Sequence, residues 1–364
     1  MQEWFGVKLE PSIRFVTLYG ASLLRLVPGV VGKAIIMLLV ALECLLWRRP
    51  SLIIDTQGLP FTYPVFSLLF GIPSAAYLHC PYVDPDTLHE KWSFLTGIFG
   101  KPYYRFILWL ESLCGYAVSL VMTNSTWTHE RVISQWSKRL NSKKCQIVYP
   151  PCELTKMAQF SLTDREPIIV SLAQFRPEKN QKMQIEILAK LFAMRPEWKG
   201  HVRMIILGGC RNSADQARAN KLLQFAKNLG LVDCIDVITN ASHEEIRHVL
   251  SVATIGLHTM PNEHFGINIV EFMAAGPIAV AHRSGGPLCD VVRSDRGFLC
   301  NTVEEYAKTI ELVLSMPEAS RREIREKART SAVTCFDVSV FERSFIANVT
   351  DFIRPLDKGK EKVY

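Results

Sequence analysis

The first thing this sequence lacks is a pattern among its cysteines. Ten cysteines are scattered over 364 residues, with no C-x-x-C pair and no Cys/His grouping at the spacing of zinc ligands. Scattered cysteines of this kind are typical of free thiols in a reducing compartment. The sequence therefore predicts neither a disulfide framework nor a structural zinc site.

Two further patterns are missing. Residues 1–28 show no signal-peptide arrangement of basic start, apolar core and small-residue cleavage site. Aromatic and basic residues are not interleaved as they are in single-strand binders, so the net charge of +7 does not indicate nucleic acid as a partner. A modest positive charge instead suits anionic ligands such as nucleotide diphosphates or acidic lipid headgroups.

No long apolar run is free of charge. Residues 29–47 are apolar apart from Lys33 and Glu43, and their length is borderline for a membrane span. Both charges would be costly in mid-bilayer, which makes the spanning interpretation the least favoured. A buried helix and a helix lying against a membrane face stay open, and the mean hydropathy of +0.11 suggests some membrane contact.

The length predicts two domains, because one hydrophobic core seldom serves so long a chain. Short strand-like runs alternate with helical segments, which favours a parallel α/β architecture. We predict an N-terminal membrane-associated domain at residues 1–152, a linker at 153–167 and a C-terminal domain at 168–335. A final crossing helix is expected at 336–356 and a disordered tail at 357–364.

The expected strands of the first half end in polar residues. They are expected at residues 52–55, 75–79, 120–123 and 146–149. Ligands of open parallel sheets bind beyond the carboxyl ends of the strands, so His79 is a candidate site residue. A lone histidine at a strand end is more often structural, and that alternative stays open.

The most informative stretch of the second half is residues 255–287, which predict strand, polar loop, helix, strand and Gly-rich loop. Glu263 is expected in the loop before the helix, and Glu271 about two turns along it. Amides at the helix start, from His264 to Ile267, have no partners inside the helix and can donate to a ligand. The alternative is a buried turn with two incidental glutamates.

Three more loops carry candidate residues. Arg176 and Lys179 follow the strand expected at 168–173, where cations can reach a bound diphosphate. Gly208 ends the next strand, and Gly285 lies in a Ser-Gly-Gly-Pro loop open enough for a phosphate to approach. Taken alone, Arg176 and Lys179 could equally belong to a solvated loop in which Glu178 is the partner.

These motifs occur in one order: IDT at 54–56, NSTWT at 124–128, YPPC at 149–152, FRPEKN at 175–180, GGCRN at 208–212, NEHFG at 262–266 and AAG at 274–276. As a set they resemble the α-1,2-mannosyltransferases of the dolichol-linked glycan pathway, within retaining glycosyltransferase family four. The resemblance runs from about residue 15 to residue 352.

The resemblance implies a GT-B fold, in which two Rossmann-like domains face each other across a cleft, with GDP-mannose as donor and no metal or other cofactor. Arg176 and Lys179 would neutralise the departing diphosphate. Glu263, with the amides of the loop and helix start around Phe265 and Gly266, would hold mannose hydroxyls. Glu271 would hold the ribose, and His79 would approach the sugar from the first domain.

The resemblance also implies an activity. Such a hexosyltransferase adds the fourth and fifth mannoses to trimannosyl-chitobiosyl-pyrophosphate-dolichol during N-glycan assembly, on the cytosolic face of the endoplasmic reticulum membrane. Other mannosyltransferases of the pathway are a further class of partner. Two alternatives stay open: a chain that binds donor or partners without transfer, and an enzyme for another GDP- or UDP-sugar.

Two departures from the family pattern stand out. Family four usually has an arginine five residues before the lysine, where this chain has Gln174. The family's N-terminal anchor and the Gly-rich strand–helix turn that follows it are not found. We therefore expect a first domain that is incomplete at its N-terminus by about one βαβ unit.

Overall fold

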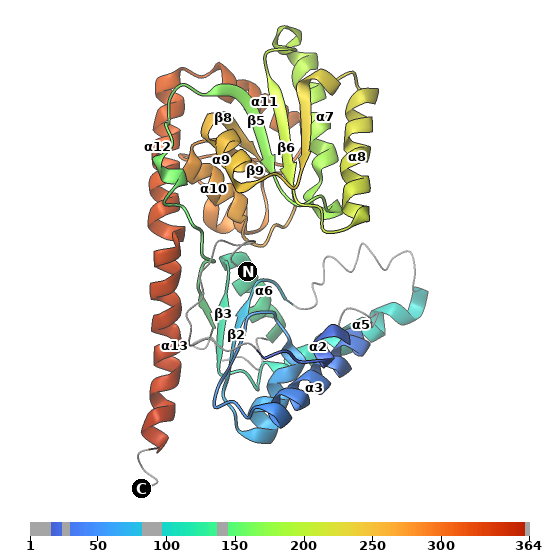
Figure 1. Ribbon diagram of the computed structural model, residues 1–364, viewed down its shortest axis with the longest axis vertical. Helices are drawn as coiled ribbons and strands as arrows, with labels where there is room; N and C mark the ends of the chain where they lie inside the picture. The colour runs from blue at the N-terminus through green and yellow to red at the C-terminus, as the bar shows by residue number, and fades with distance from the viewer. Residues whose placement is uncertain (1–15, 24–29, 82–96, 137–144, 361–364) are drawn as a thin grey trace. The chain divides into compact units, whose positions relative to one another are not determined.

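The computed structural model describes residues 16–23, 30–81, 97–136 and 145–360 (Figure 1). The chain forms two compact units. The first unit comprises Met1–Val121 and Val132–Cys145, and the second comprises Met122–Arg131 and Gln146–Tyr364. Part of the tail expected at 357–364 lies outside the described residues.

The first unit is built on a small sheet with the strand order β1-β2-β3-β4. The strands are β1 (Ile53–Asp55), β2 (Ser74–Leu78), β3 (Leu120–Thr123) and β4 (Cys145–Ile147), the last two continuing into the second unit. The helices are α2 (Gly20–Leu23), α3 (Val30–Trp47), η1 (Pro60–Thr62), η2 (Val65–Leu69) and α5 (Gly97–Cys114), while α6 (Thr126–Trp136) begins in the second unit and ends in the first. The strands expected from the sequence are confirmed to within about two residues.

Asp55 fixes the loop that follows β1. Its carboxylate accepts hydrogen bonds from the amides of Gln57, at 2.8 Å, and Leu59, at 2.6 Å. The buried hydroxyl of Tyr63 donates to the same carboxylate, again at 2.6 Å. A polar residue at a strand end thus serves the fold here, by satisfying amides of the turn.

Helix α3 is apolar on two faces. One face packs into the core of the unit through Ala34, Met37, Val40 and Ala41. The opposite face is exposed, with Leu46 at 87%, and it carries apolar side chains at helical spacing: Ile35, Leu38, Leu39, Leu42 and Leu46. Among the described residues, no helix has the length and apolar character needed to cross a membrane.

The second unit contains a parallel six-stranded sheet with the order β10-β9-β8-β5-β6-β7. The strands are β5 (Glu166–Leu172), β6 (Arg203–Gly208), β7 (Ile235–Thr239), β8 (Ala253–Leu257), β9 (Ile278–His282) and β10 (Phe298–Cys300). The longer helices are α7 (Gln181–Met194), α8 (Ser213–Asn228), α9 (His243–Val252), α10 (Ile267–Ala275), α11 (Val303–Ser315), α12 (Glu318–Phe336) and α13 (Val338–Lys360). Short helical turns are η4 (Met157–Gln159), η5 (Pro177–Lys179), η6 (Pro196–Trp198), η7 (Val232–Cys234) and η8 (Pro287–Val291).

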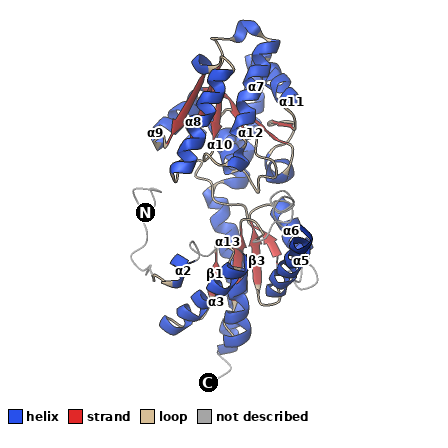
Figure 2. Cartoon of the chain, turned by 90° about the vertical axis from the view of Figure 1, so that its right-hand side faces the viewer, coloured by secondary structure: helices blue, strands red, loops and turns tan. Residues whose placement is uncertain are grey.

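Both faces of this sheet are covered by helices (Figures 1 and 2). Successive side chains of a strand point to opposite faces, so Ile169 packs with α7, α8 and α11, while Ile168 and Val170 pack with α9 and α10. Burial on both sides explains why the strands are continuous apolar runs rather than alternating ones.

The amino end of this sheet is held by buried and half-buried arginines. Arg165 donates to the carbonyl oxygens of Leu250, at 3.0 Å, and Ala253, at 2.7 Å. It also donates to the carbonyls of Ser161 and Ala275. These include carbonyls in the last turns of α9 and α10, which lack partners inside their helices. Arg165 therefore ties two helix ends and the chain entering β5 to one point.

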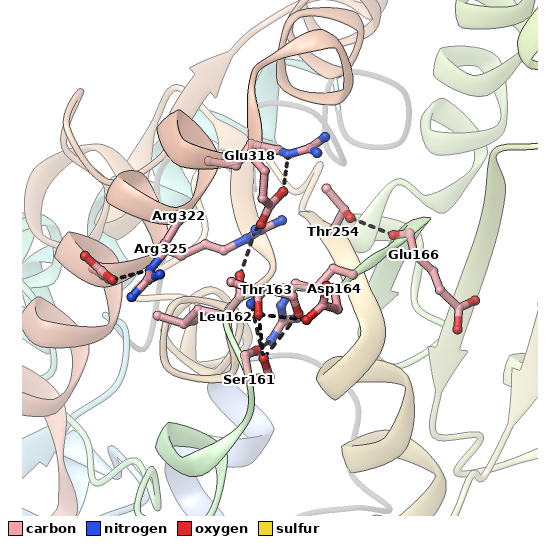
Figure 3. Close-up of polar contacts among 12 residues, drawn as sticks. Ser161, Leu162, Thr163, Asp164, Glu166, Thr254, Glu318, Arg322 and Arg325 are labelled. Carbon is pink, nitrogen blue, oxygen red and sulfur yellow. Dashed lines mark hydrogen bonds and ion pairs between the residues drawn. The ribbon is translucent and has the colours of Figure 1, made fainter.

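Two neighbouring arginines on α12 extend this arrangement. Arg325, only 1% exposed, donates to the carbonyl of Leu162 at 2.9 Å and pairs with Glu318 at 2.6 Å (Figure 3). Arg329 donates to the carbonyl of Phe160 at 2.8 Å. Burial, together with the positive charges of Arg325 and Arg329, lowers the pKa of Arg165.

Candidate active site

The loops that carry most of the predicted site residues lie at the opposite, carboxyl end of the same sheet. The turn η5 follows β5, a polar loop joins β8 to α10, and a Gly-rich loop follows β9. These three strands are neighbours in a parallel sheet, so their carboxyl ends meet at one edge.

Lys179 and Glu263 form an ion pair between two of these loops. Their side chains are 20% and 13% exposed. The hydroxyl of Thr259 donates to the carbonyl oxygen of Lys179 at 3.0 Å, which ties η5 to the end of β8. The structure thus brings together two predicted site residues that are 84 positions apart.

Glu263 has two further partners. Its Oε2 lies 3.2 Å from Nε2 of His258, and its Oε1 accepts a hydrogen bond of 3.2 Å from the amide of His264. Burial would raise the pKa of Glu263, but the hydrogen bond to His258 and the charge of Lys179 outweigh burial and hold that pKa well below its ordinary value. Glu263 is therefore a carboxylate at neutral pH.

The Gly-rich loop that follows β9 packs against the loop that carries Glu263. A Cβ at Gly285 would lie 2.2 Å from the carbonyl oxygen of Glu263, and the φ of +64° also favours glycine. The amide of Gly286 donates to the same oxygen at 2.8 Å, and Ser284 Oγ accepts from the amide of Asn262 at 2.7 Å. Glycine at 285 is thus required by contact between two loops, and its approach to a phosphate stays a prediction.

Helix α10 begins at Ile267, after Gly266 with a φ of +97°. Within the part of the chain that the structure describes, the amides of Phe265, Gly266 and Ile267 have no hydrogen-bond acceptor. They follow the Glu263 carboxylate in the chain, at the positive end of the helix dipole. This arrangement can receive hydroxyl oxygens on the amides while the carboxylate accepts from hydroxyl hydrogens.

Glu271 lies about one turn along α10, not two as predicted from the sequence. The error arose because the helix begins only after the left-handed Gly266, and not directly after Glu263. Burial raises the pKa of Glu271 to about 7. Among the described residues, its carboxyl group makes no ion pair or hydrogen bond, and a role in holding a ribose stays a prediction.

Three other residues were predicted to bind the sugar nucleotide: Arg176, Gly208 and Ile267. Arg176 pairs with Glu178 of its own turn, as the solvated-loop alternative expected, and its role toward a diphosphate stays a prediction. The carbonyl of Gly208 accepts from the amide of Asn240 at 2.8 Å. Ile267 is 43% exposed at the start of α10.

The side chains of His264 and Phe265 pack against aromatic rings. The His264 ring stacks on Trp127 with centroids 5.1 Å apart. Phe265 is buried against Tyr149 and Phe336, with centroid distances of 5.7 and 5.4 Å. The Phe265 side chain therefore anchors the loop, and its amide is the group left to donate to a ligand.

His79 belongs to the first unit, directly after β2. Its ring meets Tyr77 edge to face at 5.0 Å. Burial lowers the pKa of His79, against the opposing effects of a hydrogen bond to the Thr56 backbone and the charge of Asp55. Its contact with the sugar stays a prediction.

Two polar residues with side-chain partners in these loops, His258 and Asp290, were not predicted as site residues from the sequence. His258 lies directly after β8 and five residues before Glu263, and this spacing is the signal in the sequence that could have found it. Asp290 was not considered. It accepts hydrogen bonds from the Thr126 hydroxyl and amide and from the Tyr149 hydroxyl, at 2.9 Å for the last, and no local pattern marks it.

No group of three or more His, Cys, Asp or Glu side chains in the described ranges is arranged to hold a metal ion. Positive charge beside the loop that carries Glu263 comes from Lys179 and from the amino-terminal end of the α10 dipole.

Solved structures of similar fold define the class of protein. A glycosyltransferase from Rickettsia africae matches with a TM-score of 0.67 at 17% identity, covering 90% of this chain and 84% of that one. An α,α-trehalose 6-phosphate synthase from Burkholderia multivorans matches with a TM-score of 0.72 at 15% identity, covering 90% and 77%. The fold is that of the GT-B glycosyltransferases.

Sequence relatives narrow the class. The family described as ALG11 mannosyltransferase N-terminus matches residues 1–136, and Glycosyl transferases group 1 matches residues 154–331. Proteins named GDP-Man:Man(3)GlcNAc(2)-PP-Dol alpha-1,2-mannosyltransferase from Mus musculus and Homo sapiens are 34% and 35% identical over 372 residues, which cover 95% of this chain and 75% of each relative. The chain belongs to the ALG11 family of mannosyltransferases and is a hexosyltransferase.

Proposed function

We propose that this protein transfers mannose in α-1,2 linkage from GDP-mannose to the trimannosyl-chitobiosyl-pyrophosphate-dolichol intermediate of N-glycan assembly, with retention of configuration. The names of its relatives support this donor and acceptor. The observation that carries the proposal is the ionised Glu263 between Lys179 and the three amides at the start of α10. Such an arrangement matches a ligand that presents hydroxyls beside a pyrophosphate.

In this proposal the chain acts mainly by holding geometry and stabilising charge. An acceptor hydroxyl oxygen forms a bond to the anomeric carbon as the bond from that carbon to the GDP phosphate oxygen breaks. The hydroxyl proton passes to the departing phosphate. Lys179 stabilises the charge that develops on the diphosphate, while Glu263 holds the mannose hydroxyls in place.

We propose further that transfer needs no divalent metal ion. Lys179 and the positive end of the α10 dipole can supply the charge that a metal supplies to the diphosphate elsewhere. Transfer should therefore persist in excess EDTA. A rate that falls with EDTA and returns with added Mg²⁺ or Mn²⁺ would refute this part of the proposal.

The main test is transfer of radiolabelled mannose from GDP-mannose to a trimannosyl lipid acceptor, comparing the parent protein with Glu263→Ala. We expect products one and two mannoses larger from the parent and none from the variant. Binding of GDP-mannose without transfer by the parent would instead support a non-catalytic binding protein. Inhibition by free UDP rather than free GDP would indicate a different sugar nucleotide.

We also propose that the first unit lies against the cytosolic face of the endoplasmic reticulum membrane. The dolichol-linked acceptor named for the relatives favours a membrane location. The exposed apolar face of α3 supports it, and Arg48 and Arg49, which follow the helix, suit anionic headgroups. Leu39→Ser with Leu46→Ser should weaken flotation with phosphatidylinositol-containing vesicles, and unchanged flotation would count against this face. Association with other mannosyltransferases of the pathway remains a prediction.

A further inference from the structure

The side chain of His258 is 2% exposed, and its main chain is fixed on both sides. The amide donates to the carbonyl of Val280 at 3.0 Å, and the carbonyl accepts from the buried Tyr306 hydroxyl at 2.9 Å. The imidazole therefore projects from an anchored point at the end of β8, with Nε2 at 3.2 Å from Glu263.

The partners of the ring indicate its protonation state. The other ring nitrogen, Nδ1, is buried and has no hydrogen-bond partner in the described part of the chain. An unpaired buried N–H or charge costs more than an unpaired lone pair, so the proton belongs on Nε2, directed at the carboxylate. The other titratable groups facing this pair are Lys179 from η5 and His282 from β9, and His282 Nδ1 meets Ser284 Oγ at 2.8 Å.

The two partners of Glu263 differ in what else they can contact. Lys179 is partly exposed, so the pyrophosphate of a donor would compete with Glu263 for its ammonium group. His258 is enclosed and has no such competitor. A carboxylate held only by a shared lysine would be free to swing when the diphosphate binds, whereas a donor from an anchored ring keeps it aimed at the sugar.

We infer that His258 is a positioning residue for the transfer reaction: its Nε2–H holds the Glu263 carboxylate in the orientation that grips the sugar. The inference rests on the proposed function, because it assigns Glu263 to the donor sugar. It also predicts a selective effect: loss of the ring should weaken binding of GDP-mannose but not of GDP, which has no sugar for Glu263 to hold.

The test compares His258→Met, which keeps bulk and removes the donor, with His258→Gln, whose amide can replace the Nε2–H. We expect His258→Met to lower kcat/KM about 10- to 100-fold, the range for a hydrogen bond to a charged group. The affinity of His258→Met for GDP should match that of the parent, and its affinity for GDP-mannose should fall. The acid limb of its pH profile of kcat/KM should move to higher pH, because the Glu263 carboxylate loses a hydrogen bond. His258→Gln should recover at least part of each change.

Two controls separate positioning from loss of structure. Tyr306→Phe loosens the same strand end without touching the ring, so it should lower thermal stability while keeping the affinity gap between GDP and GDP-mannose. In a double variant with Glu263→Gln, His258→Met should cost little more, because the histidine acts through the glutamate.

Each result bears on the inference. Equal losses for GDP and GDP-mannose, no recovery with glutamine, or additive effects with Glu263→Gln would overturn it. A parent protein that transfers no mannose but binds GDP-mannose would refute the proposed function alone, and the selective change in GDP-mannose affinity would still decide the role of His258.

Discussion

The two ends of the sheet in the second unit both bury charge, but they satisfy it differently. At the amino end, Arg165, Arg325 and Arg329 donate mostly to main-chain carbonyls that stay fixed. At the carboxyl end, Lys179 and Glu263 satisfy each other across two loops, beside amides with no acceptor among the described residues. A ligand can replace a side-chain partner, but it cannot replace the carbonyls that end a helix.

This difference shows that burial of charge does not by itself mark a functional site. Guanidinium groups at the amino end complete helices α9 and α10 and so contribute to stability. The pair at the carboxyl end is joined side chain to side chain and can exchange partners. The comparison predicts that substitutions at the carboxyl end change activity with little effect on stability. Substitutions at the amino end should lower stability with little effect on activity.

The largest effect is expected for Lys179→Met. Loss of the cation that stabilises the departing diphosphate should lower kcat about 10²- to 10³-fold. Steady-state transfer from GDP-mannose measures it. Lys182→Met is the matched control, since Lys182 lies one turn further along, is 63% exposed, and contacts Glu186 and the Phe225 ring. A Lys179 variant with normal kcat would remove the distinction between the two ends.

The next largest effect is expected for Arg165→Met. Four carbonyls lose their donor, and we expect the free energy of unfolding to fall by about 3 kcal/mol. Urea unfolding measures the change, and kcat per folded molecule should stay near that of the parent. In the control Arg203→Met, an exposed arginine loses only its pair with Asp236, which should cost under about 1 kcal/mol.

The fold was largely predictable from the sequence because its indicators are local. Apolar runs bounded by polar or Gly/Pro segments predicted β3, confirmed at Leu120–Thr123, and β5, confirmed at Glu166–Leu172. The start of α10 was misjudged because the left-handed backbone of Gly266 sets it, and the polar residues before it do not reveal that conformation.

The candidate site was predictable in part for the same reason. Parallel strands bring their carboxyl ends together, so the convergence of the Lys179 and Glu263 loops followed from the strand assignment. The roles of individual arginines did not follow. Arg176 and Arg165 both lie in polar segments next to β5. Arg176 pairs with Glu178 in its own turn, whereas Arg165 donates to carbonyls up to 110 residues away in the chain. Main-chain partners leave no pattern in a sequence.

A third prediction concerns the pH dependence of stability at Glu271. Burial raises the pKa of Glu271 from 4.5 to about 7 in the folded chain. Between these values the folded state keeps a proton that the unfolded chain has lost, so this residue makes stability fall as pH rises from about 4.5 to 7. Below that window its penalty is absent, and above it the penalty is full.

Glu271→Gln should remove this slope. Relative to the parent, the variant should gain about 2–3 kcal/mol of unfolding free energy between pH 4.5 and pH 8. Urea unfolding at several pH values gives the difference between the two proteins, and Glu186→Gln on α7, where the glutamate side chain is 39% exposed, should leave the slope unchanged. Parallel pH curves for parent and Glu271→Gln would show that burial does not govern this carboxyl group.

The smallest effect is expected at Ser242, because it caps the exposed first turn of α9. The last turn of the same helix lies at the amino end of the sheet, where Arg165 donates to Leu250. The first turn is closed by a capping box, in which Ser242 and Glu245 bond each other's amides at the exposed end. Ser242→Ala should cost about 1 kcal/mol of unfolding free energy, since water can replace the lost acceptor. Ser251→Ala, where the hydroxyl only donates to the carbonyl of His248, should cost less than about 0.5 kcal/mol. If Ser242→Ala lowered the free energy of unfolding as much as Arg165→Met does, burial of the hydrogen-bonded groups would not explain why the amino end of the sheet stabilises the fold.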